Sequence, residues 1–129
     1  MIITPVFSAI FAIFFVFLSI KVIKIRQNHK IFLGTGQNKS LERAIRVHAN
    51  FAEYIPFALF LIAMLEVNKS HIIITLILCI ILLIGRIIHA WGVSTEDENF
   101  SYRVAGMVLT FSVIVFAAVM NVAVVLFSI

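Results

Sequence analysis

Four long apolar runs, separated by short polar segments, dominate the pattern of this chain. A membrane-spanning helix needs about 20 apolar residues, and we expect helices over residues 2–25, 41–67, 71–92 and 100–128. Runs such as IIITLILCIILLIG are apolar on every face, whereas the strands of a membrane barrel alternate apolar and polar residues. The pattern therefore predicts an all-α integral membrane protein, a single four-helix antiparallel transmembrane bundle over residues 1–129.

The polar segments predict the connections between these helices. Residues 27–40 contain GTGQNKS, which is typical of a loop, and Ser40 is the expected cap of the second helix. Residues 68–70 form a short turn, which makes the flanking helices antiparallel neighbours, and VSTEDENFS is an acidic loop. Pro56 is expected to bend the second helix or to mark where it enters the bilayer.

The composition agrees with a membrane protein. Of the 129 residues, 63% are hydrophobic and 12% are charged, whereas a soluble domain has about 25% charged residues. The single cysteine, Cys79, excludes an intrachain disulfide. Basic residues on the inner side of a membrane explain the net charge of +4, so nucleic acid is not an expected partner.

The two ends of the predicted bundle differ in charge. Lys69 alone lies at the end that holds both termini. All other lysines and arginines lie at the end with the first and third connections: Lys21, Lys24, Arg26, Lys30, Lys39, Arg43, Arg46, Arg86 and Arg103. Because cytoplasmic loops are enriched in basic residues, we expect both long connections in the cytoplasm and both termini outside.

The second predicted helix carries an ionic face. Arg43, Arg46, Asn50 and Glu53 follow one another at steps of three, four and three, which places them on one side of a helix. This face leads directly into the apolar run FALFLIAMLEV. Ionisable groups carried to such a depth indicate a functional site.

The topology brings polar residues of all four helices to the cytoplasmic end: Arg26, Arg43, Arg46, His48, Asn50, Glu53, Arg86, His89 and Arg103. Several arginines beside one carboxylate suit an anionic ligand, because the planar guanidinium matches carboxylates and stabilises a nearby thiolate. Since the chain has no cysteine there, a thiolate would arrive with the ligand. Glu53 and Asn50 suit an amine or amide of that ligand.

Structural explanations stand beside ligand binding. The arginines of the ionic face are equally explained as anchors to phospholipid headgroups. Glu53 is equally explained by an ion pair with Arg46 or Arg86 that fixes the register of the bundle. His48 and His89 lack the i, i+4 spacing and the cysteine neighbours of a metal site. We therefore expect no metal, and packing between helices is the simpler explanation of both histidines.

Residues 42–56, ERAIRVHANFAEYIP, resemble the second-helix signature ERxxRAxxNxxEyxP of the MAPEG proteins, the membrane-associated proteins in eicosanoid and glutathione metabolism. GRIIHAWG, with Arg86 and His89, looks like the RxxH end of the family's third helix, and Arg103 falls where a thiol-activating arginine opens the fourth. HANFAEYIPFAL and GRIIHAWG are most similar to the short bacterial members. The resemblance covers essentially the whole chain.

The resemblance implies a homotrimer that binds glutathione in a cytoplasm-facing cleft between neighbouring protomers. By motif position, the residues implied to bind glutathione are Arg26, Arg46, Asn50, Glu53, Tyr54 and His89. The implied catalytic residue is Arg103, which would stabilise the glutathione thiolate. Arg43 and Arg86 match positions that tie helices together.

Three positions depart from the eicosanoid enzymes of that family. Val93 lies one turn after His89, where leukotriene-C synthase and microsomal prostaglandin E synthase have a tyrosine. Ala49 and Val104 replace an arginine and a serine of the prostaglandin enzyme. We therefore do not expect an eicosanoid substrate.

Two classes of function follow. The first is a glutathione-dependent transferase or peroxidase of the inner membrane, which acts on a lipophilic electrophile or hydroperoxide that enters from the lipid bilayer. The second is a small multidrug-type transporter or a non-catalytic membrane scaffold, in which Glu53 would be the membrane-embedded carboxylate. Arg103 favours the first class, because such a transporter does not explain it.

Overall fold

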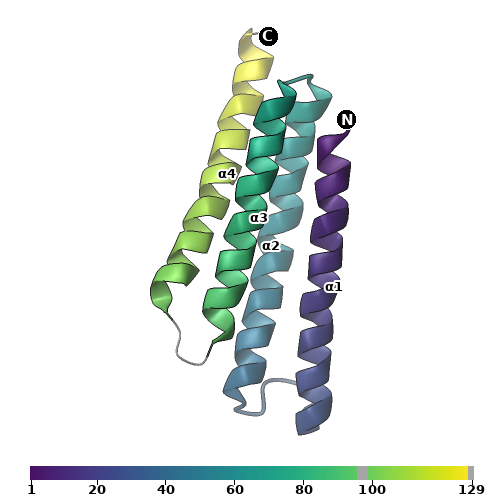
Figure 1. Cartoon of the computed structure of the whole chain (residues 1–129), viewed down its shortest axis with the longest axis vertical. Helices are drawn as coiled ribbons and strands as arrows, with labels where there is room; N and C mark the ends of the chain where they lie inside the picture. The colour runs from purple at the N-terminus through teal and green to yellow at the C-terminus, as the bar shows by residue number, and fades with distance from the viewer. Residues whose placement is uncertain (96–98, 128–129) are drawn as a thin grey trace.

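The computed structural model describes residues 1–95 and 99–127. In this part of the chain it contains four α-helices: α1 (Ile3–His29), α2 (Lys39–Val67), α3 (Ile72–Ser94) and α4 (Phe100–Phe127). They form an antiparallel bundle with both termini at one end and the α1–α2 connection at the other (Figure 1). All four are long and apolar enough to cross a bilayer. The predicted all-α, four-helix architecture is therefore confirmed.

The helix ends differ from the prediction where polar residues continue a helix beyond its apolar run. We expected the first helix to end at residue 25, but α1 continues to His29 and ends with Lys30 in the left-handed conformation at φ 54°. Lysine, arginine and glutamine are good helix formers, so the end of the apolar run does not end the helix. The third helix continues to Ser94 instead of residue 92. The expected last residue of the fourth helix, residue 128, lies outside the described residues.

The cap of α2 also differs from the prediction. Asn38, rather than Ser40, is the N-cap, and its side-chain oxygen accepts a hydrogen bond of 2.9 Å from the Leu41 N–H. Asparagine is as good an N-cap as serine, and the cap position satisfies an amide that has no partner within the helix. The helix therefore begins at Lys39, and its first turn adds two residues to the end that carries the ionic face.

Helix α2 is the centre of the packing, since it contacts α1, α3 and α4. Its buried residues recur every three or four positions along the whole helix: Leu41, Ala44, Val47, Phe51, Ile55, Ala58, Ile62 and Leu65. Glu42, Arg46 and Glu53 are exposed on the other side of the helix. The packing of the bundle therefore turns these charged side chains away from its core.

A carboxylate at the end of α2 caps the start of α1. The Glu66 carboxylate accepts hydrogen bonds from the backbone N–H groups of Ile2, Ile3 and Thr4, the last two at 2.8 Å, and from the Thr4 hydroxyl. Amides at a helix start have no intrahelical partner and are costly to leave unpaired in apolar surroundings. Glu66 thus holds α1 to α2 at the end of the bundle opposite the ionic face.

Glycines bring α3 and α4 to backbone contact. A Cβ atom on Gly106 would lie 2.6 Å from the His89 Cβ and 2.7 Å from the Gly85 carbonyl oxygen. A Cβ on Gly92 would lie 2.7 Å from the Tyr102 Cβ. Small residues at such contacts are typical of membrane helices, which associate through close packing because lipid supplies no hydrophobic driving force.

We predict that Gly106→Ala destabilises the bundle by about 1–3 kcal/mol, the usual cost of overpacking. The added methyl group meets backbone atoms, which cannot rotate away, so α3 and α4 must separate. The measurement is a denaturant titration of the purified protein in detergent. Ala9→Val, which adds methyl groups on an exposed position of α1, is the matched control and should unfold like the wild type. Equal stability of Gly106→Ala and the wild type would show that the contact tolerates a side chain.

Candidate functional site

A small polar pocket of about 60 Å³ lies between α2, α3 and α4. Its lining residues are Arg46, Ala49, Asn50, Glu53, His89, Val93 and Arg103. Five of the residues implied by the family signature therefore share one pocket, although they come from three helices. The close contact at Gly106 explains part of this arrangement, because it holds the α4 backbone against His89 of α3.

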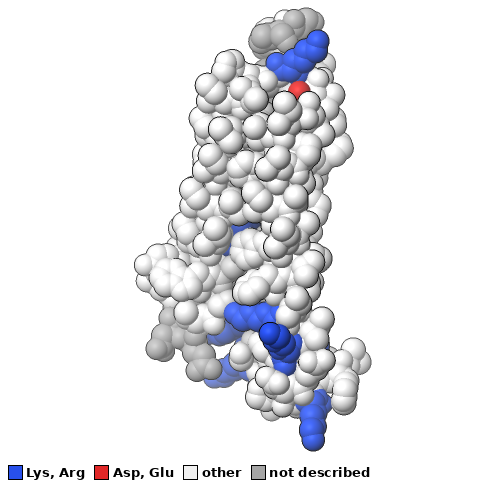
Figure 2. All heavy atoms as spheres, turned by 45° about the vertical axis from the view of Figure 1, so that its right-hand side comes forward, with Lys and Arg blue, Asp and Glu red and all other residues white. Residues whose placement is uncertain are grey.

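A wider basin of about 360 Å³ adjoins the pocket towards the N-terminal end of α2. It shares Arg46, Val93 and Arg103 with the pocket and adds Lys39, Glu42 and Arg43. In the face shown in Figure 2, lysine and arginine side chains gather at this end of the molecule, and only a small group lies at the other end. The basin thus has four cationic side chains and one carboxylate.

Glu53 is exposed on the surface of the bundle, near the middle of α2. Among the described residues it forms no ion pair with Arg46 or Arg86, so the interhelical pair considered as an alternative is not present there. An ionised carboxylate facing hydrocarbon is costly, and such groups normally face protein or a water-filled cavity. Glu53 lines the pocket, so its carboxylate can accept hydrogen bonds from a group that enters there.

Arg86 is the largest fully buried side chain in the described structure, with 1% of its surface exposed. From α3 it donates to the Asn50 side-chain oxygen of α2 at 2.7 Å and to the Gly106 carbonyl oxygen of α4 at 3.3 Å. A third contact of 3.5 Å joins it to the Met107 sulfur. Arg86 thus ties three helices together, as its family position implied, and lies directly behind the pocket.

The bond from Arg86 also orients the Asn50 amide. A guanidinium has donors but no acceptor, so the Asn50 atom at 2.7 Å from Arg86 must be its oxygen. The amide nitrogen is then left to donate to a group in the pocket. Asn50 therefore favours a ligand that presents a hydrogen-bond acceptor.

Three polar residues considered from the sequence, Arg26, His48 and Tyr54, do not line the pocket. Arg26 donates to the carbonyl oxygens of Ile31 and Gly34, at 3.3 and 2.9 Å, in the α1–α2 connection. Tyr54 makes an edge contact with the Phe111 ring of α4, with 5.3 Å between centroids. His48 is 2.9 Å from the Ser19 hydroxyl and stacks on an α1 phenylalanine, so it packs between α1 and α2.

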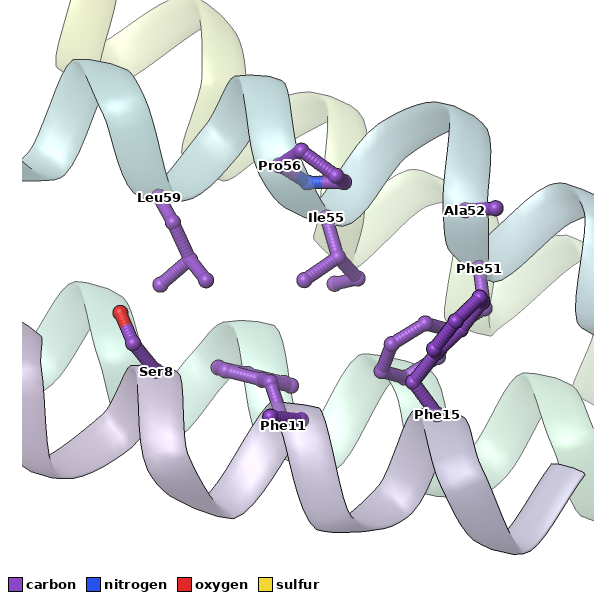
Figure 3. Close-up of a pocket in the computed structure, with 9 residues that line it drawn as sticks. Ser8, Phe11, Phe15, Phe51, Ala52, Ile55, Pro56 and Leu59 are labelled. Atoms are coloured by element: carbon purple, nitrogen blue, oxygen red, sulfur yellow. The ribbon is translucent and has the colours of Figure 1, made fainter. Parts of the chain in front are cut away.

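An apolar groove of about 460 Å³ runs between α1 and α2. Across it, side chains of α1 face side chains of α2 (Figure 3): Ser8, Phe11 and Phe15 against Phe51, Ile55 and Leu59. No charged residue lines it. The groove suits an apolar molecule or surface, whereas the pocket and basin suit an ionic ligand.

The pocket can bind a zwitterionic or anionic ligand. Arg46, Arg103 and the Asn50 amide can donate to anionic groups, and Glu53 can accept from an ammonium group. We did not predict from the sequence that Lys39 and Glu42 line a cavity, although they lie one turn before Arg43 and Arg46 at helical spacing. The helical spacing could have placed Lys39 and Glu42 on the same face as the arginines. It does not show which other helix lies opposite that face.

Known proteins are similar to this chain over most of its length. The model of the MAPEG family matches residues 4–123. The chain belongs to the MAPEG family. It is also 29% identical, over 119 residues, to the inner membrane protein YecN of Escherichia coli strain K12, covering 92% of this chain and 89% of YecN. YecN of the E. coli strain O6:H1 matches to the same extent.

Membership of the MAPEG family, together with four apolar helices, makes this chain an integral membrane protein with a four-helix bundle. The family identified from the second-helix signature is confirmed. The match extends from the start of α1 almost to the end of α4, so it includes every residue of the pocket and the basin.

We predict that Asn50→Leu lowers the free energy of unfolding by about 1–3 kcal/mol, because it leaves a buried Arg86 donor without its acceptor. Asn50→Asp keeps an oxygen at that position and should match or exceed the wild type. Thermal unfolding in detergent measures both variants, with Asn28→Leu at the exposed end of α1 as control. Equal loss in the leucine and aspartate variants would contradict the assigned hydrogen bond.

Proposed function

We propose that this MAPEG protein is a membrane-bound glutathione-dependent transferase or peroxidase. The observation that carries the proposal is the joint lining of one pocket by Arg46, Asn50, Glu53, His89 and Arg103. This donor set fits a zwitterionic tripeptide with carboxylates and one ammonium group. YecN is named as an inner membrane protein, and we assign the same location to this chain.

Arg103 acts on the thiol in this proposal. It lines both the pocket and the basin, so it lies beside the middle of a ligand that extends through the two. A guanidinium stabilises a thiolate and cannot act as a base, so the thiol proton passes to water. The sulfur then forms a bond to an electrophilic carbon, and the leaving group departs with the bonding electron pair. With a hydroperoxide, two thiols are oxidised to a disulfide and the hydroperoxide is reduced to alcohol and water.

The second substrate is a lipophilic molecule that reaches the site from the bilayer. The apolar groove between α1 and α2 supports this part of the proposal, because it offers an uncharged surface beside the α2 turn that carries Glu53. Holding the glutathione thiol and the second substrate in the geometry of reaction supplies much of the rate enhancement of a two-substrate enzyme. The basic end of the bundle faces the cytoplasm in this proposal, in accordance with the excess of lysine and arginine there.

A homotrimer is the proposed active unit. Glu53 is exposed on the protomer although it lies within an apolar span, and a neighbouring copy would cover it. Arg26 lies outside the pocket of its own protomer, and a neighbouring copy would supply it. A pocket of about 60 Å³ is also far smaller than ordinary ligand sites, which have volumes of about 300–1,000 Å³.

We predict that the purified wild type binds glutathione at millimolar concentration and conjugates it to a generic electrophile. Arg103→Ala should retain binding within a few fold but lose about 10²-fold or more in rate, as when one donor to a developing anion is removed. Equilibrium dialysis and a spectrophotometric conjugation assay measure the two effects. Lys69→Ala, at the far end of the bundle, is the control.

Equal rates for Arg103→Ala and the wild type would show that Arg103 does not activate the thiol. Absence of glutathione binding would overturn the function itself. The transporter would then be the better candidate, since Glu53 is an exposed carboxylate within an apolar span. Its signature would be proton-coupled uptake of a lipophilic cation into vesicles, lost in Glu53→Gln.

Mixed trimers test whether Arg26 acts across the protomer boundary. Arg26→Ala and Arg103→Ala should each be nearly inactive, but their co-expression should restore about a quarter of the wild-type sites if protomers of a closed ring assemble at random. The restored sites combine Arg103 of one protomer with Arg26 of its neighbour. Conjugation rates of the co-purified mixture measure this. If Arg26 acts within its own protomer, the mixture will be as inactive as its components.

A further inference from the structure

The connection between α1 and α2 carries the two most exposed large apolar side chains of the described structure. Phe32 is 91% exposed and Leu33 is 92% exposed. Most other exposed apolar side chains belong to the four helices, where the hydrocarbon of the bilayer covers them. Phe32 and Leu33, called the apolar pair below, follow the end of α1 at His29 and need a different cover.

Hydrogen bonds hold the connection in a defined turn. The Arg26 side chain donates to the carbonyl oxygens of Ile31 and Gly34, at 3.3 and 2.9 Å, and the Ile31 N–H donates to the Arg26 carbonyl oxygen at 3.0 Å. Gly34 has a φ of 69°, which a residue with a Cβ atom rarely adopts. The Ile31 side chain lies against Gly36, since a Cβ atom there would be 2.9 Å from the Ile31 Cδ1 atom. Ile31 thus packs inside the turn, whereas the apolar pair that follows it is exposed outside the turn.

The length of α1 places this turn at the surface of the bilayer. The apolar run from Ile3 to Ile25 rises about 33 Å, which matches the hydrocarbon thickness of about 30 Å. The remaining residues to His29 add about 6 Å, and the headgroup layer on each side is about 5–8 Å thick. The bond from Ile31 to Arg26 turns the chain back, so the apolar pair lies at the level of the headgroups.

The sequence around the apolar pair is basic. Residues 21–40 contain five lysines and arginines and neither aspartate nor glutamate. Lys24 and Lys30 are exposed, whereas the Arg26 side chain is bonded within the turn. Lysines at a membrane surface attract anionic headgroups, and apolar side chains beside such lysines enter the boundary between headgroups and hydrocarbon. The turn combines both kinds of side chain.

The size of the apolar pair favours lipid over a protein partner. An aromatic side chain buries about 150–250 Å², so one aromatic and one aliphatic side chain offer roughly half of the about 800 Å² that each partner buries in a typical protein interface, or less. Lipid molecules can cover single side chains. The bilayer is also already present at the depth of the turn.

We propose that the α1–α2 connection is an anchor to anionic phospholipid at the membrane surface. Phe32 and Leu33 insert among the headgroups, and Lys24 and Lys30 bind lipid phosphates. The inference is independent of the proposed function, since none of these four residues lines the pocket or the basin. In this arrangement the bilayer fixes the turn that engages the Arg26 side chain.

Lipid-specific fluorescence quenching tests the anchor. The full chain is reconstituted into phosphatidylcholine bilayers with phosphatidylglycerol as the minor lipid. Since the chain has one tryptophan, Phe32→Trp in a Trp91→Phe background makes position 32 the single reporter. Bromine near the glycerol end of the acyl chains is placed on one lipid or on the other. We expect both lipids to quench, phosphatidylglycerol more strongly per molecule, and aqueous iodide to quench little.

Further variants of this reporter protein separate charge from apolarity. Lys30→Gln should lower the preference for phosphatidylglycerol about fivefold, the effect of one lysine near an anionic surface. Leu33→Ser should reduce quenching by both lipids and increase quenching by iodide, because it removes one side chain of the apolar pair. Lys69→Gln removes a positive charge at the opposite end of the bundle and is the matched control. It should change neither result.

Three results would overturn the proposal. Strong quenching by iodide with none by either brominated lipid would place the connection in water. Protection from iodide and from both lipids would show that a second copy of the chain or another protein covers it. Equal quenching by the two lipids, unchanged in Lys30→Gln, would show insertion without recognition of anionic headgroups.

Discussion

The arrangement of this protein depends on one buried arginine. Arg86 extends from α3 to the side chain of Asn50 on α2 and to the backbone of Gly106 on α4. Leaving a guanidinium without partners inside an apolar bundle is costly, so the three helices must meet where these acceptors lie. Gly106 makes the meeting possible, because any side chain there would overlap His89 and the Gly85 carbonyl. The residue that fixes the helices also turns the Asn50 amide towards the pocket, so the stability of the bundle and the geometry of its site depend on the same contact.

The two ends of the bundle use different means to satisfy polar groups. At one end, the Glu66 carboxylate accepts hydrogen bonds from the first amides of α1, so this carboxylate is satisfied within the bundle. At the other end, Arg46, Glu53 and Arg103 are exposed in the protomer and line cavities. Since α2 buries its apolar residues against all three other helices, its ionic face has to be covered by something else. A ligand and a neighbouring protomer are the two coverings that the proposed function requires.

Val93 illustrates how this chain differs from the eicosanoid enzymes of the family. It lines both cavities, and its carbonyl oxygen accepts a hydrogen bond of 3.3 Å from Arg43. The valine side chain has no hydroxyl group, so the polar side chains of both cavities come from the residues around it.

The sequence alone determined the class of protein, the four helices, their antiparallel order and the family. The length of each apolar run and the signature around Arg46, Asn50 and Glu53 are local properties, which can be recognised in the sequence itself. The tertiary structure decided the rest. Lipid-facing and core-facing positions are equally apolar in a membrane helix, so hydropathy does not show that Glu53 is exposed or that Arg86 is buried. The bond between Arg86 and Asn50, the cap supplied by Glu66 and the basin beside Lys39 each join residues far apart in the chain or on different helices. Their formation depends on the rotation of each helix about its axis; for α3 and α4, close packing at Gly85 and Gly106 constrains that rotation.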